Sequence, residues 1–251
     1  MATRPAVLTL SRWWHGLIAA VIAVALVIQV VLVFQGGADA NSGQTGEAAG
    51  VGIRLWRLFS YFTIQSNLIL LAAALVLAAR PAFDGRVWRV VRLDALLGIL
   101  ITGLVYAIVL APQIHVTGWA LAATIGFHYV SPWAAVAAWL VLGPRPGAGG
   151  WGTVAAAFLW PVLWLVYIFV QGAFTHWYPY PFMDVTEIGF GAALRNALLV
   201  VVVALVFAAL VKLLDRKLPA LTRRPREDAD PPAGTRLGSA AGHPAREGRS
   251  R

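Results

Sequence analysis

Thr63 and His128 are the side chains with the clearest chemical potential, because each lies inside a long apolar segment of the sequence. A polar side chain in such a segment costs free energy unless it is paired or faces a cavity. A threonine hydroxyl becomes a nucleophile when an adjacent base takes its proton, and histidine is the most frequent base. The two residues therefore suit nucleophile–base chemistry if the fold brings them together.

A purely structural role is the alternative for both residues. Thr63, Ser66 and Asn67 stand at spacing i, i+3, i+4, so they share one helix face that must point into a bundle. Such residues form hydrogen bonds between membrane helices, and a threonine also bonds back to a carbonyl of its own helix. A neutral His128 bonded to a carbonyl or hydroxyl of a neighbouring helix is equally compatible with the sequence.

Arg195 and Asn196 lie within the last apolar segment. A guanidinium is costly there unless it reaches the membrane surface, pairs with Asp184 or Glu187 of the preceding loop, or holds a substrate carboxylate. Asn196 either packs between helices or donates a hydrogen bond to an oxyanion. The candidate oxyanion donors in the sequence are Ser66, Asn67 and Asn196.

The segment 176–185, just before that last apolar run, is rich in aromatic residues and proline. Its residues of interest are Trp177, Tyr178, Tyr180 and Asp184. Prolines stiffen a loop, and Trp and Tyr rings suit the headgroup level of a membrane. We favour an aromatic belt at the interface, and a lid over a cavity between helices is the alternative.

The elements that must position these residues are transmembrane helices. Of the 251 residues, 59% are hydrophobic and 12% are charged, against about 25% charged in soluble domains. Six apolar runs are each long enough to cross a bilayer, which predicts an all-α, six-span bundle. They cover about 13–35, 55–79, 93–111, 118–142, 153–173 and 188–212. There is no cysteine, so disulfides, thiolate metal sites and cysteine nucleophiles are excluded.

The distribution of positive charge predicts that both termini are cytoplasmic and that the chain lies in the cell membrane. One set of segments contains Arg4, Arg12, Arg80, Arg86, Arg89, Arg92, Arg145, Lys212, Arg216 and Lys217. The alternate set contains only Arg54 and Arg57. The net charge of +9 therefore indicates contact with anionic headgroups at the cytoplasmic face and no nucleic-acid partner.

Two polar segments flank or interrupt the membrane domain, which spans residues 1–217. The segment 36–52 is rich in Gly, Ala, Ser and Asn and is predicted to be a flexible, exposed loop. Residues 218–251 combine Pro, Gly, Arg and acidic residues without apolar periodicity, which predicts a disordered basic tail in the cytoplasm.

Depth in the membrane is the sequence argument that links Thr63 to His128. If the second span enters from outside near residue 55, Thr63 lies ~12 Å inside it at 1.5 Å per residue. If the fourth span enters near residue 118, His128 lies ~15 Å inside it by the same rise. The two side chains are therefore expected at similar heights in the outer half of the membrane.

Two motifs resemble those of a known family. The string Tyr61-Phe62-Thr63-Ile64-Gln65-Ser66-Asn67-Leu68 resembles the signature of the bacterial six-span family named Pr-six-Pr. The segment 177–185 resembles the loop before that family's last span, and His128 and Pro132 match its fourth span. The resemblance covers about residues 10–215.

That family is more remotely similar to the animal androgen-induced-gene proteins, which are membrane threonine hydrolases of fatty acid esters of hydroxy fatty acids. The resemblance implies that Thr63 is the nucleophile and that His128 is the second essential residue. It also implies a membrane lipid or fatty-acyl ester as the substrate, with no metal and no cofactor.

Two other functional classes remain open at this stage. One is a non-enzymatic membrane transporter or lipid-binding protein in which Thr63 and His128 are structural polar residues. A proton-linked transporter usually carries a buried carboxylate, and no predicted span has one near its middle, which weakens this alternative. The other is a structural partner in a larger membrane complex, for which the sequence offers no test.

Overall fold

The computed structural model describes residues 4–45, 49–143 and 150–217, and within them the chain is all-α. These ranges contain no strand, although one β-bridge pairs Ala38 with Thr45. The all-α class predicted from the sequence is therefore confirmed. The predicted tail, residues 218–251, lies outside the described residues.

Five of the described helices are long and apolar enough to cross a membrane. They are Pro5–Gln35, Phe62–Ala79, Arg86–Leu110, Trp151–Thr175 and Phe190–Lys217. The fourth predicted span is helical throughout Gly118–Val141 but does not belong to this group. Its apolar run is interrupted by His128, Ser131 and Pro132, which lower its mean hydropathy.

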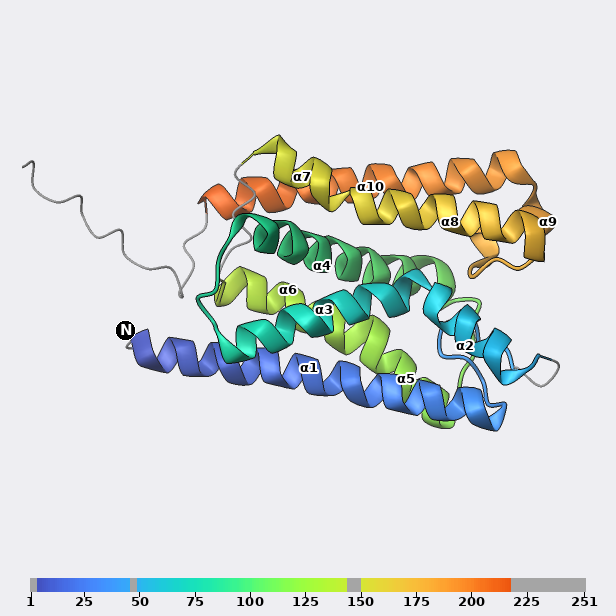
Figure 1. Ribbon diagram of the computed structural model, residues 1–251, viewed down its shortest axis with the longest axis horizontal. Helices are drawn as coiled ribbons and strands as arrows, with labels where there is room; N and C mark the ends of the chain where they lie inside the picture. The colour runs from blue at the N-terminus through green and yellow to red at the C-terminus, as the bar shows by residue number, and fades with distance from the viewer. Residues whose placement is uncertain (1–3, 46–48, 144–149, 218–251) are drawn as a thin grey trace, which may run out of the picture.

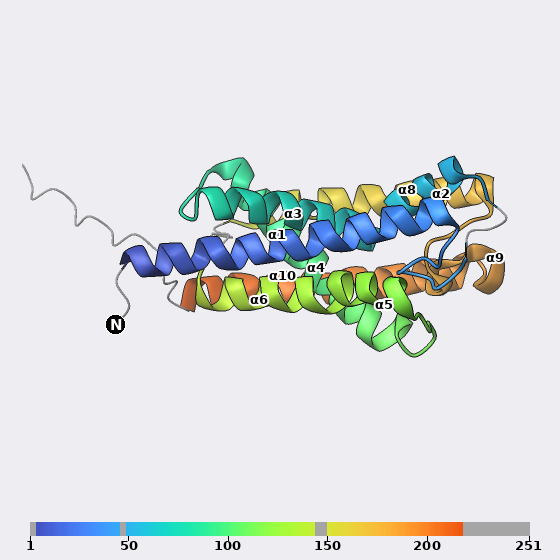
Figure 2. The same ribbon diagram turned by 90° about the horizontal axis from the view of Figure 1, so that it is seen from below.

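The first group of helices forms the side of the bundle that holds most buried polar residues. Here α1 (Arg4–Gln35) packs along α3 (Phe62–Ala79) and along the segment formed by α5 (Gly118–Ile125), η2 (Gly126–Val130) and α6 (Ser131–Val141). Figure 2 shows α3 and the α5–α6 segment on opposite sides of α1. The helix α4 (Arg86–Val105) packs against both α3 and α6.

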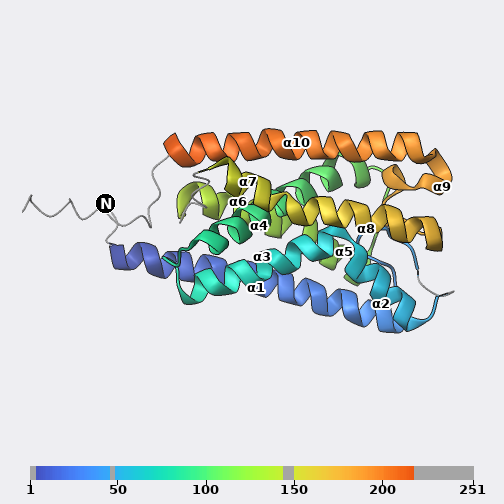
Figure 3. The same ribbon diagram turned by 45° about the horizontal axis from the view of Figure 1, so that its top comes forward.

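The second group lies on the other side of α4 from α1 (Figure 1). It consists of α7 (Trp151–Ala157), α8 (Leu159–Thr175) and α10 (Phe190–Lys217). In the tilted view α10 runs along one edge of the bundle, with α8 between it and α3 (Figure 3). Between α8 and α10 the chain passes through η3 (Pro181–Met183) and α9 (Val185–Ile188).

The second predicted span, 55–79, is not one helix. It consists of α2 (Val51–Ser60) and α3, separated at Tyr61, which is extended with φ −66° and ψ 132°. In a continuous helix the carbonyl of Ser60 would accept from the backbone four residues later, but here it accepts from Trp164 Nε1 at 2.9 Å. The break therefore depends on α8 and leaves Thr63 in the first turn of α3.

Two segments of π-helix face each other beside the site. They are η1 (Tyr106–Leu110), which continues α4, and η2, which contains His128. Pro132 follows η2 and has no N–H to donate to the carbonyl of His128, so the regular α-helical pattern cannot pass through this point. Wider turns of this kind are frequent at functional sites.

Residues 36–43, the first part of the segment predicted to be flexible and exposed, are folded onto the bundle, which corrects that prediction for this part. Ala40 and Asn41 are 0% and 1% exposed. The Ala40 carbonyl accepts from Thr124 Oγ1 at 2.8 Å, and the Ala40 N–H donates to Gln29 Oε1 at 2.9 Å. Burial raises the pKa of Asp39, which accepts from three N–H groups of Asn41 and the following residue. Hydrogen bonds to Gln29, Thr124 and Asp39 therefore order this segment, although its composition is typical of a flexible loop.

Candidate functional site

The structure brings Thr63 and His128 together. Thr63 Oγ1 lies 3.3 Å from His128 Nε2, and the two residues are 3% and 1% exposed. Thr63 comes from the first turn of α3 and His128 from η2, so the matched depth expected from the sequence corresponds to a direct contact. The distance is at the long end for a hydrogen bond, as is common in an active site without substrate.

The hydrogen bond on the other side of the imidazole sets its tautomer. His128 Nδ1 lies 3.2 Å from the carbonyl of Thr124, one turn earlier in the same segment. A carbonyl only accepts, so Nδ1 carries the proton, and a neutral imidazole then leaves Nε2 bare. Nε2 is therefore the atom that can accept the hydrogen bond of the Thr63 hydroxyl, which is the arrangement a general base requires.

Tyr180 completes the chain of hydrogen bonds from the opposite side of Thr63. Its hydroxyl lies 3.3 Å from Thr63 Oγ1 and accepts from the Thr63 N–H at 3.1 Å. Since the Thr63 proton points to His128, Tyr180 donates its own proton to Thr63 Oγ1. Burial raises the pKa of Tyr180 to about 12, so the phenol stays protonated and remains a donor across the physiological range.

The loop 176–185 turns its tyrosines inward, so these two rings are not exposed as the favoured aromatic belt would have them. Tyr178 and Tyr180 are 8% and 5% exposed. The ring of Tyr178 lies so close to Gly172 that a Cβ added at Gly172 would come within 2.3 Å of it. Trp177 remains partly exposed and packs against Trp56, with 5.4 Å between ring centroids. The loop is therefore a cover over the site.

Asp184 ends this cover and has a structural role. Its carboxylate accepts from the backbone N–H of Thr186 at 2.9 Å and so caps the short helix α9. Among the described residues, no ion pair joins Asp184 or Glu187 to Arg195. The pairing considered from the sequence is therefore absent in the described part of the chain.

The imidazole of His128 is held by the π-helix on α4 as well as by Thr124. The ring of Tyr106 stacks on it, with 3.9 Å between centroids and 22° between planes. Gly103 lets the two helices approach this closely, because a Cβ there would lie 2.8 Å from Pro132 Cβ. The imidazole is thus held by the Tyr106 ring stacked on it and by the hydrogen bond of Nδ1 to the Thr124 carbonyl.

The oxyanion donors expected from the sequence are all engaged elsewhere. Ser66 Oγ donates to the carbonyl of Phe62 at 2.7 Å. Asn67 Nδ2 donates to the carbonyls of Thr63 and Phe127 at 2.9 and 3.3 Å. Asn196 Nδ2 donates to the carbonyl of Phe182 at 2.9 Å. These three side chains therefore stabilise the bundle and the cover.

Arg195 also lies away from Thr63. Its side chain is exposed on α10, and Nη2 donates to Asn196 Oδ1 at 3.4 Å. Arg195 does not line the apolar cavity in front of Thr63, so the structure gives no support to its binding a substrate carboxylate there.

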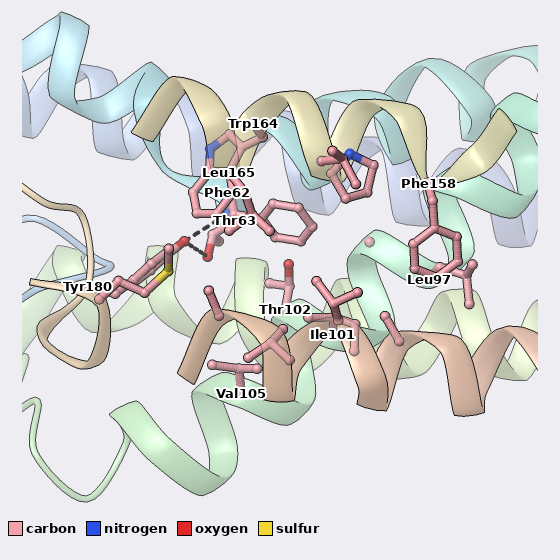
Figure 4. Close-up of a pocket in the computed structure, with 18 of the residues that line it drawn as sticks. Phe62, Thr63, Leu97, Ile101, Thr102, Val105, Phe158, Trp164, Leu165 and Tyr180 are labelled. Carbon is pink, nitrogen blue, oxygen red and sulfur yellow. Dashed lines mark hydrogen bonds between the residues drawn. The ribbon is translucent and has the colours of Figure 1, made fainter. Parts of the chain in front are cut away.

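A largely apolar cavity opens in front of Thr63, between α3 and α4 on one side and α8 and α10 on the other (Figure 4). It encloses about 840 Å³ of empty space, including its open part. The described residues that line it with a hydroxyl group are Thr63, Thr102, Tyr106 and Tyr180. The remaining lining is supplied by apolar residues such as Phe62, Leu97, Ile101, Phe158, Trp164, Leu165 and Val201. Such a lining suits a hydrocarbon chain.

Three contributors to the site had no assigned role in the sequence argument. Thr124 lies one turn before His128, and Tyr106 lies where α4 changes into the π-helical segment η1. Hydrophobic periodicity does not reveal either position. Thr102 is a lone threonine in an apolar run, and such residues are common in membrane helices. The Pro132 interruption after His128 was the available sequence signal for an irregular helix.

No group of three or more His, Asp or Glu side chains that could hold a metal ion occurs within residues 4–45, 49–143 and 150–217. A comparison of the chain with protein-family models, curated proteins and solved structures finds no match. The functional assignment below therefore rests on the site itself and on the motif resemblance.

Proposed function

We propose that this protein is an integral-membrane hydrolase of lipid esters, with Thr63 as nucleophile and His128 as general base. The observation that carries the proposal is the linear chain of hydrogen bonds from Tyr180 through Thr63 to His128, at the wall of an apolar cavity. A structural threonine would be satisfied by one partner in its own helix. Thr63 Oγ1 instead contacts side chains from two distant segments.

The reaction proceeds in two steps. Thr63 Oγ1 attacks the acyl carbonyl carbon while its proton passes to His128 Nε2. Collapse of the tetrahedral adduct breaks the ester C–O bond, and the departing alkoxide takes the proton from His128. Water then attacks the acyl-threonine, gives one proton to His128, and the collapse of this second adduct releases the fatty acid and returns the proton to Thr63.

The substrate class follows from the cavity and from the motif resemblance. An apolar, partly open cavity between helices accepts a membrane-dissolved ester that enters sideways from the bilayer. Fatty acid esters of hydroxy fatty acids are the candidate substrates that the resemblance suggests. The proposed reaction uses only protein side chains and water, so it requires no metal and no cofactor.

The proposed topology has six spans and both termini in the cytoplasm. Gly118–Val141, the fourth span in chain order, is added to the five helices that are long and apolar enough to cross a membrane. The start of α1, the start of α4 and the end of α10 lie at one end of the bundle (Figure 1). These helix ends carry Arg12, Arg86, Arg89, Arg92, Lys212, Arg216 and Lys217. The positive-inside rule assigns that end to the cytoplasm. Thr63 and His128 would then lie in the outer half of the cell membrane.

The experiment for this proposal measures hydrolysis of fluorogenic fatty-acyl esters by purified protein in mixed micelles. We expect Thr63→Val and His128→Gln each to lower kcat/KM by about three orders of magnitude or more, because the pair acts as a unit. Thr153→Val on α7 is the matched control, since Thr153 does not line the cavity. Hydrolysis unchanged in Thr63→Val would refute the assignment.

A lipid-binding or transport protein without catalysis is the second candidate. The observation that favours it is the Asn67–Ser131 pair beside the site, at 2.7 Å, which shows that buried hydroxyls here also serve as links between helices. Under this alternative the wild type binds long-chain esters without cleaving them, and the assay above separates the two.

A further inference from the structure

A hydrolase of the proposed kind needs a donor for the negative charge that develops on the carbonyl oxygen. This requirement rests on the proposed function. The sequence candidates, Ser66, Asn67 and Asn196, donate to backbone carbonyls and do not line the cavity. The donor must therefore be a different group that lines the cavity near Thr63.

Thr102 has the properties that such a donor requires. It is 4% exposed, it lines the same cavity as Thr63, and Oγ1 has no hydrogen-bond partner. Of the buried polar side-chain atoms without a partner in the described ranges, Thr102 Oγ1 is the one that belongs to a cavity-lining residue. A helical threonine normally satisfies its hydroxyl at a carbonyl of the preceding turn, so this arrangement leaves a donor available.

The packing of α3 against α4 places Thr102 beside the first turn of α3, which contains the nucleophile. The two helices are antiparallel neighbours, and a Cβ at Gly98 would lie 3.2 Å from Ser66 Oγ, which fixes their register. Moving outward by one turn on each helix pairs Thr102 with Phe62, the residue next to Thr63. Figure 4 shows the Thr102 oxygen pointing into the cavity toward the side occupied by Thr63.

We propose that Thr102 Oγ1 is the oxyanion donor of this enzyme. Its O–H donates to the carbonyl oxygen of the bound ester and keeps that hydrogen bond as the oxygen becomes an alkoxide in the tetrahedral adduct. No proton leaves Thr102 during the reaction. Thr63 and His128 form and break the covalent bonds, and Thr102 contacts the oxygen on which the charge appears.

The first test uses ester hydrolysis by Thr102→Val, which keeps the shape of the side chain and removes the hydroxyl. We expect kcat to fall about 10²–10³-fold, as when an oxyanion donor is removed from other hydrolases, with little change in KM. Thr102→Ser restores the hydroxyl and should recover most of the rate. Thr153→Val on α7, outside the cavity, is the matched control. Wild-type kcat in Thr102→Val would overturn the proposal.

The second test reads the hydrogen bond directly and does not depend on turnover. A long-chain methyl ketone with a ¹³C-labelled carbonyl is bound to the protein, and its carbonyl stretch is measured by infrared difference spectroscopy. Donation from Thr102 lowers the stretching frequency in the wild type, and Thr102→Val shifts it back toward the value in hydrocarbon. Equal frequencies in the two proteins would refute the assignment even if esters are cleaved. A shift without any ester cleavage would refute the hydrolase and keep Thr102 as a carbonyl ligand.

Discussion

Removal of the Tyr180 hydroxyl is a sharp test of the hydrogen-bond chain at the site. The substitution Tyr180→Phe preserves the ring, which packs on Tyr61 and Phe182 with centroid distances of 5.6 and 5.4 Å. It removes the acceptor of the Thr63 N–H and the donor to Thr63 Oγ1. The effect on stability therefore isolates the hydroxyl from the packing.

Two separate effects are expected, one at neutral pH and one in the alkaline range. A buried N–H left without a partner costs about 1–3 kcal/mol, so Tyr180→Phe should lower the free energy of unfolding by that amount at neutral pH. The pKa of Tyr180 is raised by burial from its ordinary 10.0 to about 12. At about 1.4 kcal/mol for each pH unit, protonation of the buried phenol contributes roughly 3 kcal/mol to the folded state.

The sign of the pH dependence follows from the raised pKa. A group whose folded pKa lies above its unfolded pKa contributes its full stability below the unfolded value and loses it as pH rises through the folded value. The wild type should therefore lose up to about 3 kcal/mol more than Tyr180→Phe between pH 10.0 and about 12. The gap between the two proteins should close in this window.

Equilibrium unfolding in detergent, followed from neutral pH to pH 12, measures this gap. Tyr129→Phe is the control, because the ring of Tyr129 is 39% exposed and lies outside the Tyr180–Thr63–His128 chain. A difference between the wild type and Tyr180→Phe that stays constant across the alkaline range would refute the reasoning, since it would mean that the Tyr180 hydroxyl is not buried.

Three further predictions concern the surroundings of the site. Gly172→Ala should displace the ring of Tyr178 and lower ester hydrolysis at least tenfold, whereas Gly152→Ala, which has open space around it, should leave the rate unchanged. Asn67→Leu should lower the free energy of unfolding by about 2–4 kcal/mol in denaturant titrations, because buried groups lose their partners. Arg195→Gln should keep the kcat/KM of the wild type, and a large loss would place the guanidinium in the substrate site after all.

The fold class was accessible from the sequence because the apolar runs are long and are bounded by charge. The first and last residues of the helices were harder to predict, since α1 begins at Arg4, nine residues before the predicted start. The break at Tyr61 could not be predicted. It depends on a hydrogen bond from Trp164, more than one hundred residues away in the sequence, and not on the local propensity of the chain.

Some features of the candidate site could likewise be predicted from the sequence and others could not. Depth counted along two spans placed Thr63 at the level of His128, and the two side chains are in contact, although Tyr61 interrupts the helix along which one depth was counted. The partners of the buried face could not be predicted, so Ser66 and Asn67 were considered as oxyanion donors, whereas both donate to backbone carbonyls. The burial of Tyr180 reverses the interfacial role that tyrosine usually has in membranes, and only the contact of its hydroxyl with Thr63 on α3 reveals it.

The central claim, that Thr63 is a nucleophile activated by His128, is tested most directly by a covalent probe. Purified protein is treated with a lipophilic fluorophosphonate, digested, and the modified residue is located by mass spectrometry. We predict one adduct on Thr63 in the wild type and in Thr153→Ala, no adduct in Thr63→Ala, and strongly reduced labelling in His128→Ala with folding preserved. An adduct on any other residue, or a wild type that folds but is not labelled, would contradict the claim.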